Sequence, residues 1–254
     1  MQFQPPSGYP LGTNRTFKYA SSVVIPILNL LTKRNWLGSE NLPKSGAVIV
    51  ISNHISYADA LVFAHFLYGN GRAVRYLGKD SVFKIPVLGR ILLSAGQIPV
   101  ARESDKASHA LDSALGLLKA GHCVGIYPEG TLTRDENLWP MVAKTGVARL
   151  SIMSKAPVIP IAQWGDQDLL APYSKRVVFW RRTKITYLAG PALDFSTWYG
   201  KEEDQAALVE ATAYAMAEIT KLLEQIRREL APHEIFDPHN SPLPRTGNFK
   251  KKKD

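Results

Sequence analysis

Short β-branched runs alternate with segments of helical periodicity along most of the chain, and this alternation constrains the fold more than any other feature. The run at 47–51 follows the turn residues 43–46, and apolar residues at helical spacing then occupy 60–67. The same reading gives strands at 74–77, 97–100, 123–127 and 158–161, and helices at 87–93, 107–119 and 147–154. We therefore predict an α/β fold: a single domain whose mixed, largely parallel sheet is flanked by helices.

The last third of the chain predicts the edge of this sheet and a long closing helix. Residues 177–180 and 184–188 are expected to add edge strands, and apolar residues at helical spacing run through 203–230. Beyond Pro232 the sequence turns to Pro, Asn and Gly and then to four lysines at 250–253. We predict one folded domain over 35–230 and a disordered basic tail over 231–254, because the tail has too little apolar content to fold.

The first 34 residues predict a membrane-associating helical segment. Their apolar stretch, about 20–31, contains Ser, Pro and Asn and is well short of the ~20 apolar residues that span a bilayer. Basic residues flank it: Arg15 and Lys18 before, Lys33 and Arg34 after. This pattern fits an interfacial helix that lies among lipid headgroups, and it fits equally a helix packed on the domain's own core. The opening residues lack the basic and apolar regions of a signal peptide.

The charge of the chain predicts an anionic partner. A net charge of +9 and a pI near 9.6 suit nucleic acid, an acidic membrane surface or a phosphorylated substrate. The single cysteine, Cys123, excludes an internal disulfide and is compatible with a reducing, cytoplasmic setting.

The segment Asn53-His54-Ile55-Ser56-Tyr57-Ala58-Asp59 directly follows the first predicted buried strand. On one continuous helix His54 and Asp59 would lie about 140° apart, so they meet only if His54 is in a loop and the helix starts near Ser56. Ser56 and Asp59 have the spacing of a capping box, which supports that start. Asp59 then either orients His54 or only caps the helix.

A second loop is expected at the same edge of the sheet. Tyr127-Pro128-Glu129-Gly130-Thr131 follows the fourth predicted strand, and ligands of open α/β sheets bind beyond the carboxyl ends of the strands. Taken alone, Pro-Glu-Gly is an ordinary turn. Both loops are therefore expected at the same edge of the sheet, where such binding crevices lie.

With these segments in order, residues 35–195 resemble the glycerolipid acyltransferase family typified by 1-acylglycerol-3-phosphate acyltransferases. The resemblance rests on four blocks: Asn53-His54…Asp59, Gly96-Gln97-Ile98-Pro99-Val100-Ala101-Arg102, Tyr127-Pro128-Glu129-Gly130-Thr131, and Val158-Ile159-Pro160-Ile161. It implies that His54 and Asp59 are catalytic and that an acyl thioester, of coenzyme A or of acyl-carrier protein, is the donor substrate, with no cofactor. It also implies that Arg102 and the Glu129-Gly130-Thr131 loop contact the phosphate of a lysophospholipid acceptor.

Two further cations are candidates for that phosphate. Lys79 follows the second predicted strand, although it is equally well read as a solvated loop lysine. Many members of the family carry Arg directly after Glu-Gly-Thr, whereas this chain has Leu132, with Thr133 and Arg134 after it. Either Arg134 reaches the phosphate from a shifted position, or the acceptor differs from lysophosphatidic acid.

The chemistry suits these residues. A lipid hydroxyl becomes a good nucleophile when a positioned base removes its proton, and histidine titrates in the useful range. Asp59 would fix the tautomer of His54 and stabilise the imidazolium, with the substrate hydroxyl in the place of a catalytic serine. No metal site is predicted, because His65, His109 and His122 show no ligand spacing with His54.

We therefore expect an enzyme of phospholipid biosynthesis that makes phosphatidic acid, peripheral or monotopic at the cytoplasmic face of the cell membrane. One alternative is an acyltransferase for another lysolipid or a glycolipid hydroxyl. An alternative of another class is a non-catalytic basic protein that binds membranes or nucleic acid. Nucleic acid is disfavoured as a partner, because no aromatic-basic stacking motif is present.

Overall fold

Seven strands form one sheet in the part of the chain that the computed structural model describes, residues 10–100, 104–242 and 244. The order is β1-β7-β6-β2-β5-β3-β4, and every neighbouring pair is parallel except the antiparallel pair β6 and β7. The strands are β1 (Thr32–Leu37), β2 (Val48–Ser52), β3 (Val74–Lys79), β4 (Ile98–Val100), β5 (Cys123–Ile126), β6 (Val158–Trp164) and β7 (Thr183–Ala189). The central strand β2 is buried along its whole length, as expected for a parallel strand covered on both faces.

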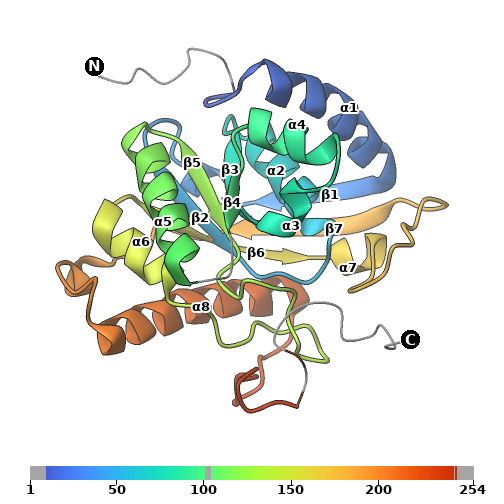
Figure 1. The fold of residues 1–254 in the computed structure, drawn as a ribbon. Helices are drawn as coiled ribbons and strands as arrows, with labels where there is room; N and C mark the ends of the chain where they lie inside the picture. Colours follow the sequence, from blue (N-terminus) through green and yellow to red (C-terminus); the bar gives the residue numbers. More distant parts are fainter. Residues whose placement is uncertain (1–9, 101–103, 243, 245–254) are drawn as a thin grey trace.

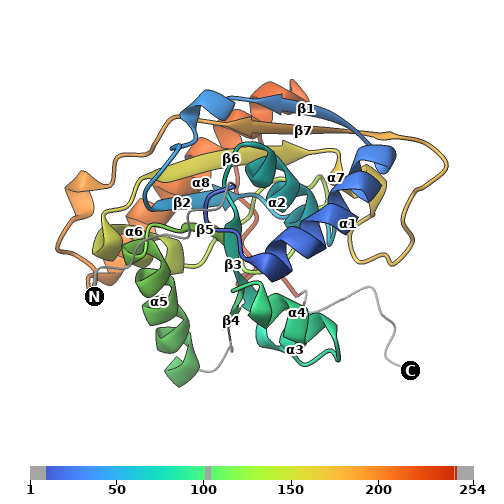
Figure 2. The ribbon, with the colours of Figure 1, turned by 90° about the horizontal axis from the view of Figure 1, so that it is seen from above.

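Helices cover both faces of this sheet (Figure 1; Figure 2 gives the view from above). The helices α5, α6 and α8 pack with the sheet around one apolar core, and α1 and α2 pack around a second core on the other face. The α-helices are α1 (Arg15–Leu31), α2 (Asp59–Gly69), α3 (Asp80–Phe83), α4 (Leu88–Ser94), α5 (Ser104–Lys119), α6 (Gly146–Ser154), α7 (Asp166–Leu169) and α8 (Gln205–Arg227). The predicted α/β domain with a mixed, largely parallel sheet is confirmed.

One end of the sheet, at β1 and β7, differs from the prediction. Residues 177–180 form no strand; only Val177 makes an isolated bridge, to Leu170, and Phe179 and Trp180 point their rings into solvent. The edge strand is instead β1, which the sequence did not predict. Its residues Thr-Lys-Arg-Asn-Trp-Leu show no apolar alternation, and their strand geometry comes from parallel pairing with β7.

The N-terminal helix α1 begins at a capping residue and carries its apolar residues on two faces. Asn14 Oδ1 accepts from the amide of Phe17 at 2.8 Å, which satisfies one free donor of the first turn. Leu28 is buried against the domain, whereas another set of apolar side chains faces outward: Tyr19, Val23, Ile27 and Leu30. Among the described residues, no helix has the length and apolar character to cross a bilayer.

Residues just beyond the predicted domain boundary at 230 contact the rest of the protein. The amide of Ala231 donates to Glu224 Oε1 of α8 at 2.8 Å, and the amide of Val142 donates to the Phe236 carbonyl at 2.9 Å. Ordered contacts therefore extend at least to Phe236. The lysine run 250–253 lies outside the described residues.

Candidate active site

The candidate site lies just beyond the carboxyl end of β2, where the chain passes to α2. Asn53 fixes this loop to the neighbouring strand β6 through three hydrogen bonds with Gln163. The Asn53 side chain donates to the Gln163 carbonyl and accepts from its amide, while the Gln163 side chain donates to the Asn53 carbonyl at 2.6 Å. Both residues are fully buried, so the residue that follows, His54, starts from a rigid point.

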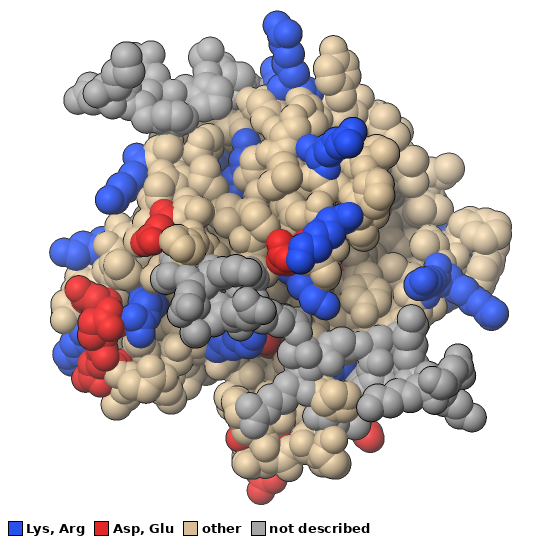
Figure 3. All heavy atoms as spheres, viewed as in Figure 1, with Lys and Arg blue, Asp and Glu red and all other residues tan. Residues whose placement is uncertain are grey.

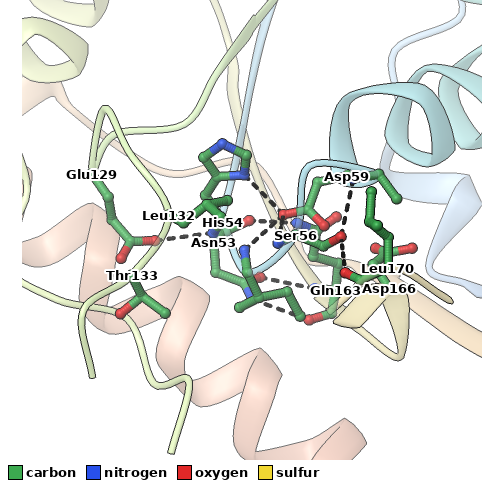
Figure 4. A network of polar contacts seen from close by, with 12 residues as sticks. Asn53, His54, Ser56, Asp59, Glu129, Leu132, Thr133, Gln163, Asp166 and Leu170 are labelled. Carbon is green, nitrogen blue, oxygen red and sulfur yellow. Dashed lines mark hydrogen bonds and ion pairs between the residues drawn. The ribbon is translucent and has the colours of Figure 1, made fainter. Parts of the chain in front are cut away.

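His54 and Asp59 are in contact (Figure 4). As predicted, His54 lies in the loop that precedes the helix rather than on the helix itself. His54 Nδ1 lies 2.8 Å from Asp59 Oδ2, and the side chain of Asp59 is fully buried while that of His54 is 18% exposed. The same carboxylate oxygen accepts from the amides of Ile55 at 2.7 Å and Ser56 at 2.9 Å. Asp59 thus both orients the histidine and stabilises the loop, so the two interpretations of this residue are compatible.

The helix itself begins at Asp59, three residues later than predicted. Ser56 Oγ accepts from the amide of Ala58 and donates to the Leu170 carbonyl, and residues 57 and 58 form a turn. A capping box has two reciprocal hydrogen bonds, and only one of them is present: the Ser56 amide donates to the side chain of Asp59. The turn sets Asp59 beside His54.

Tyr127 of the second loop forms one wall of the site. Its ring stacks on His54 with centroids 4.2 Å apart and an interplanar angle of 16°, and Tyr76 of β3 stacks behind it at 6.0 Å. Burial raises the pKa of both phenols well above their ordinary value, so both remain neutral. Stacking leaves His54 little freedom to rotate away from Asp59.

Glu129 does not open into the site but holds the two loops together. Its Oε1 accepts from the His54 amide at 3.0 Å and its Oε2 accepts from the Met141 amide at 3.1 Å. The residue is 3% exposed, and burial raises the pKa of its carboxyl to about 8, although both amide bonds favour the charged form. The amide of Thr133 adds a further link, donating to the His54 carbonyl at 2.8 Å.

Glu129 is expected to give the stability of the protein a pH dependence. Its pKa rises from 4.5 to about 8 on burial, so between these values the folded chain binds more protons than the unfolded chain. The contribution to the free energy of unfolding is therefore largest below pH 4.5 and declines as the pH rises to about 8. Glu129→Gln removes the titrating group, and we expect its melting temperature to vary less across this window. Parallel pH series of thermal unfolding check this, and equal slopes for the two proteins would contradict it.

The predicted phosphate-binding residues differ in how far they are exposed to solvent. Lys79 is exposed at the carboxyl end of β3, and Gly130 and Thr131 lie on the accessible side of the Glu129 loop. Arg134 is only 3% exposed, and its Nη1 donates to the hydroxyl of Tyr173. A contact between Arg134 and a substrate phosphate would have to share or replace that bond. Arg102 lies outside the described residues.

Lys144 is a further cation beside this loop that the sequence reading missed. Its amide donates to the Pro128 carbonyl at 3.0 Å, and its Cε lies 3.2 Å from where a Cβ on Gly130 would stand. Gly130 has a φ of +68°, which glycine adopts without strain. Lys144 lies 14 residues after Gly130 in the sequence, and a single exposed lysine carries no sequence signal of its own.

Comparison with known proteins shows which family this chain resembles. The family model described as Acyltransferase matches residues 33–164, which is more than half of the chain. The 1-acyl-sn-glycerol-3-phosphate acyltransferase of Bacillus subtilis is 27% identical over 83% of this chain and 100% of its own length. The enzyme of the same name from Borreliella burgdorferi is 27% identical over 75% of this chain and 71% of its own.

A solved structure shares the fold. The crystal structure of the 1-acyl-sn-glycerophosphate (LPA) acyltransferase PlsC from Thermotoga maritima matches with a TM-score of 0.63 at 22% identity, covering 86% of each chain. At this identity the match establishes the fold alone. The family match establishes that the chain is an acyltransferase and belongs to the Acyltransferase family.

Proposed function

We propose that this acyltransferase moves a fatty acyl group from an acyl thioester to the free hydroxyl of 1-acyl-glycerol-3-phosphate, which yields phosphatidic acid. The observation that carries the proposal is the contact of 2.8 Å between His54 Nδ1 and the buried carboxylate of Asp59. The names of the relatives from Bacillus subtilis and Borreliella burgdorferi support the choice of acceptor. The thioester donor is that of coenzyme A or of acyl-carrier protein.

The pair acts as a general base. His54 donates a hydrogen bond from its protonated Nδ1 to Asp59. The lone pair of Nε2 is therefore available to the acceptor hydroxyl. As Nε2 takes the hydroxyl proton, the oxygen attacks the thioester carbonyl and the C–S bond breaks. The leaving thiolate then takes the proton back from Nε2, which restores neutral His54. Asp59 stabilises the imidazolium that exists between these two transfers.

An apolar cavity near the pair is suited to an acyl chain. It measures about 590 Å³ and is lined by α1, α2, α4 and β3, with Tyr76 among its lining residues. Its volume lies within the ordinary range of small-molecule sites. Tyr76 stacks on Tyr127, which stacks on His54, so these rings link the cavity wall to the catalytic pair.

The phosphate of the acceptor requires cations, and three residues are proposed to supply them: Arg102, Arg134 and Lys144. A charge-assisted hydrogen bond contributes about 1.5–3 kcal/mol, so we expect Arg102→Ala to raise the KM for the lyso-acceptor roughly tenfold to a hundredfold. The KM for the acyl donor should change much less. Steady-state kinetics with each substrate varied separately check this, and Arg134→Ala and Lys144→Ala measured beside it locate the phosphate among the three. Equal changes in both KM values would remove Arg102 from the phosphate site.

The identity of the acceptor depends on the loop after Glu129, where Leu132 stands in the place of the arginine in the family pattern. Leu132 is 2% exposed, so this position presents no polar group to a phosphate. We expect purified protein with a labelled acyl donor to prefer 1-acyl-glycerol-3-phosphate within a panel that includes lysophosphatidylglycerol and a glycolipid. Preference for another acceptor would support the alternative lysolipid substrate. Transfer to none of them would contradict the proposed acceptor class.

We also propose that the enzyme works at a membrane surface, since its acceptor is a lipid. The outward side chains of α1, at positions 19, 23, 27 and 30, fall within one arc of the helix at about 100° per residue. Such an apolar face with basic flanking residues is typical of helices that lie in the headgroup region.

A further inference from the structure

The loop between α7 and β7, residues 171–182, exposes two neighbouring aromatic rings. Phe179 is 75% exposed and Trp180 is 73% exposed, and their centroids lie 5.6 Å apart in an edge-to-face arrangement. The chain has five tryptophans; Trp139 and Trp198 are buried, and Trp36 and Trp164 are half-buried. Trp180 is therefore the most exposed of the five. Apolar side chains grouped on a surface in this way are typical of interaction sites.

This loop is fastened to the C-terminal end of α1. Arg182 Nη2 donates to the Asn29 carbonyl at 3.0 Å and to the Thr32 carbonyl at 2.7 Å. Figures 1 and 2, which differ by a quarter turn, both place the loop just beyond the C-terminal end of α1. The two segments are about 150 residues apart in the sequence, yet they form neighbouring parts of one surface.

The apolar residues of both segments together define what we call the docking face: Tyr19, Val23, Ile27, Leu30, Phe179 and Trp180. Each of these six side chains is more than half exposed. The face therefore combines an apolar helix side with a pair of rings at its end. Among aromatic residues, Trp and Tyr are the two that concentrate at membrane–water interfaces, because one part of each ring system is apolar and another is polar.

The charge around the docking face has one sign. Residues 171–184 contain Lys175, Arg176, Arg181, Arg182 and Lys184 and no acidic residue, and residues 10–39 contain no acidic residue either. At the right-hand edge of Figure 3, where Figure 1 draws this loop, Lys and Arg atoms stand beside uncharged side chains. A basic rim around apolar side chains is complementary to an anionic lipid leaflet, to which each cation adds about 1 kcal/mol.

We infer that the loop 171–182 is a second membrane anchor, which inserts Phe179 and Trp180 into the headgroup region of an anionic bilayer beside α1. The inference rests on the proposed function, because that function supplies the reason for the enzyme to meet lipid. It deepens that function by identifying the surface that meets the bilayer. Tyr19 and Val23 of the docking face also line the apolar cavity, so an acyl chain can enter that cavity from the membrane side.

Vesicle binding of the full chain tests the contribution of the rings. The probes are vesicles of phosphatidylcholine alone and of phosphatidylcholine mixed with phosphatidylglycerol. Phe179→Ser combined with Trp180→Ser should lower the partition coefficient about tenfold or more on the mixed vesicles, at both low and high salt, because two apolar rings no longer leave water. The matched control is Val209→Ser, an exposed apolar side chain of α8 on the opposite face of the sheet, which should bind as the wild type does.

Fluorescence quenching places Trp180 directly. Vesicles that carry bromine atoms on their acyl chains should quench the emission of the wild-type protein, and Trp180→Phe should remove most of that quenching. The four tryptophans that remain in Trp180→Phe are buried or half-buried, so we expect the vesicles to quench them much less than Trp180. Unchanged quenching in Trp180→Phe, or unchanged vesicle affinity in the double variant, would overturn the inference. If the double variant instead altered the sedimentation of the free protein, the rings would belong to a contact between two chains, which would also overturn it.

Acyl transfer measured in detergent micelles separates this inference from the proposed function. The double variant should keep its turnover there, since neither ring contacts the His54 site. Loss of vesicle binding with intact micellar transfer supports the anchor. Transfer that is absent even in the wild type, while Trp180 is still quenched by the vesicles, would contradict the proposed function and leave the anchor supported.

Discussion

His54→Ala is expected to lower the turnover number by about 10²–10⁴, because the acceptor hydroxyl then loses the base that removes its proton. The fold should survive, since the side chain is partly exposed and the loop is held through backbone groups by Glu129 and Gln163. Steady-state turnover beside thermal unfolding checks both statements.

A second His–Asp pair on the surface supplies the matched control for this experiment. His239 Nδ1 lies 2.9 Å from Asp237 Oδ1, and both side chains are accessible to solvent. His239→Ala should leave the turnover number unchanged. A folded His54→Ala variant with near-normal turnover would rule out His54 as the general base.

Asp59→Asn is expected to lower both the turnover number and the stability. Asp59 Oδ2 accepts from His54 Nδ1 and from two loop amides, and an asparagine NH₂ group turned toward His54 would force the proton onto Nε2. The base is then in the wrong tautomer, and we expect a loss of turnover of about 10²–10⁴. A buried polar group left without its partner adds a cost of about 1–3 kcal/mol to the folded state.

Activity and thermal unfolding measured on the same Asp59→Asn preparation separate these two effects. A chain of this size loses roughly 2–4 °C in melting temperature for each kcal/mol. We expect the melting temperature to fall by several degrees and the turnover to fall far more than that loss of stability explains. A lowered melting temperature with normal turnover would assign Asp59 to the start of α2 alone.

The sequence predicted the layered fold well because the core strands of this sheet carry their own signal. The runs at 47–51, 123–127 and 158–161 are apolar and β-branched, and each became a buried strand. The edge strand β1 was missed because its geometry depends on a partner 151 residues away, Thr183 beside Thr32. The apolar run 177–180 was misread for the opposite reason. Its residues have high strand propensity, yet they are exposed on a loop.

The sequence predicted that His54 and Asp59 would meet, but it did not predict where Glu129 lies or that Lys144 stands beside the same loop. The contact between His54 and Asp59 follows from local geometry, since the two residues are five positions apart and are joined by one short loop. The position of Glu129 depends on contacts with the amides of His54 and Met141, 75 and 12 residues away, which no local pattern encodes. Lys144 was missed for the same reason, because its place beside Gly130 is set by the path of the loop that returns to α6.

Direct attack by the acceptor requires that no acyl group be carried by the protein. The one cysteine, Cys123, is 2% exposed within β5, and burial raises the pKa of its thiol to about 12, so it stays protonated. Cys123 is therefore not expected to carry the acyl group. We expect His54 to act directly on the acceptor hydroxyl.

Intact-mass measurement of the enzyme with a labelled acyl-coenzyme A tests this direct transfer. Without acceptor, we expect no acyl adduct on the protein and no release of free thiol. Adding 1-acyl-glycerol-3-phosphate should release thiol and form labelled phosphatidic acid in equal amounts, with His54→Ala defective in both. An acyl adduct that forms on the protein without acceptor, and then passes its label to added acceptor, would contradict direct attack assisted by His54.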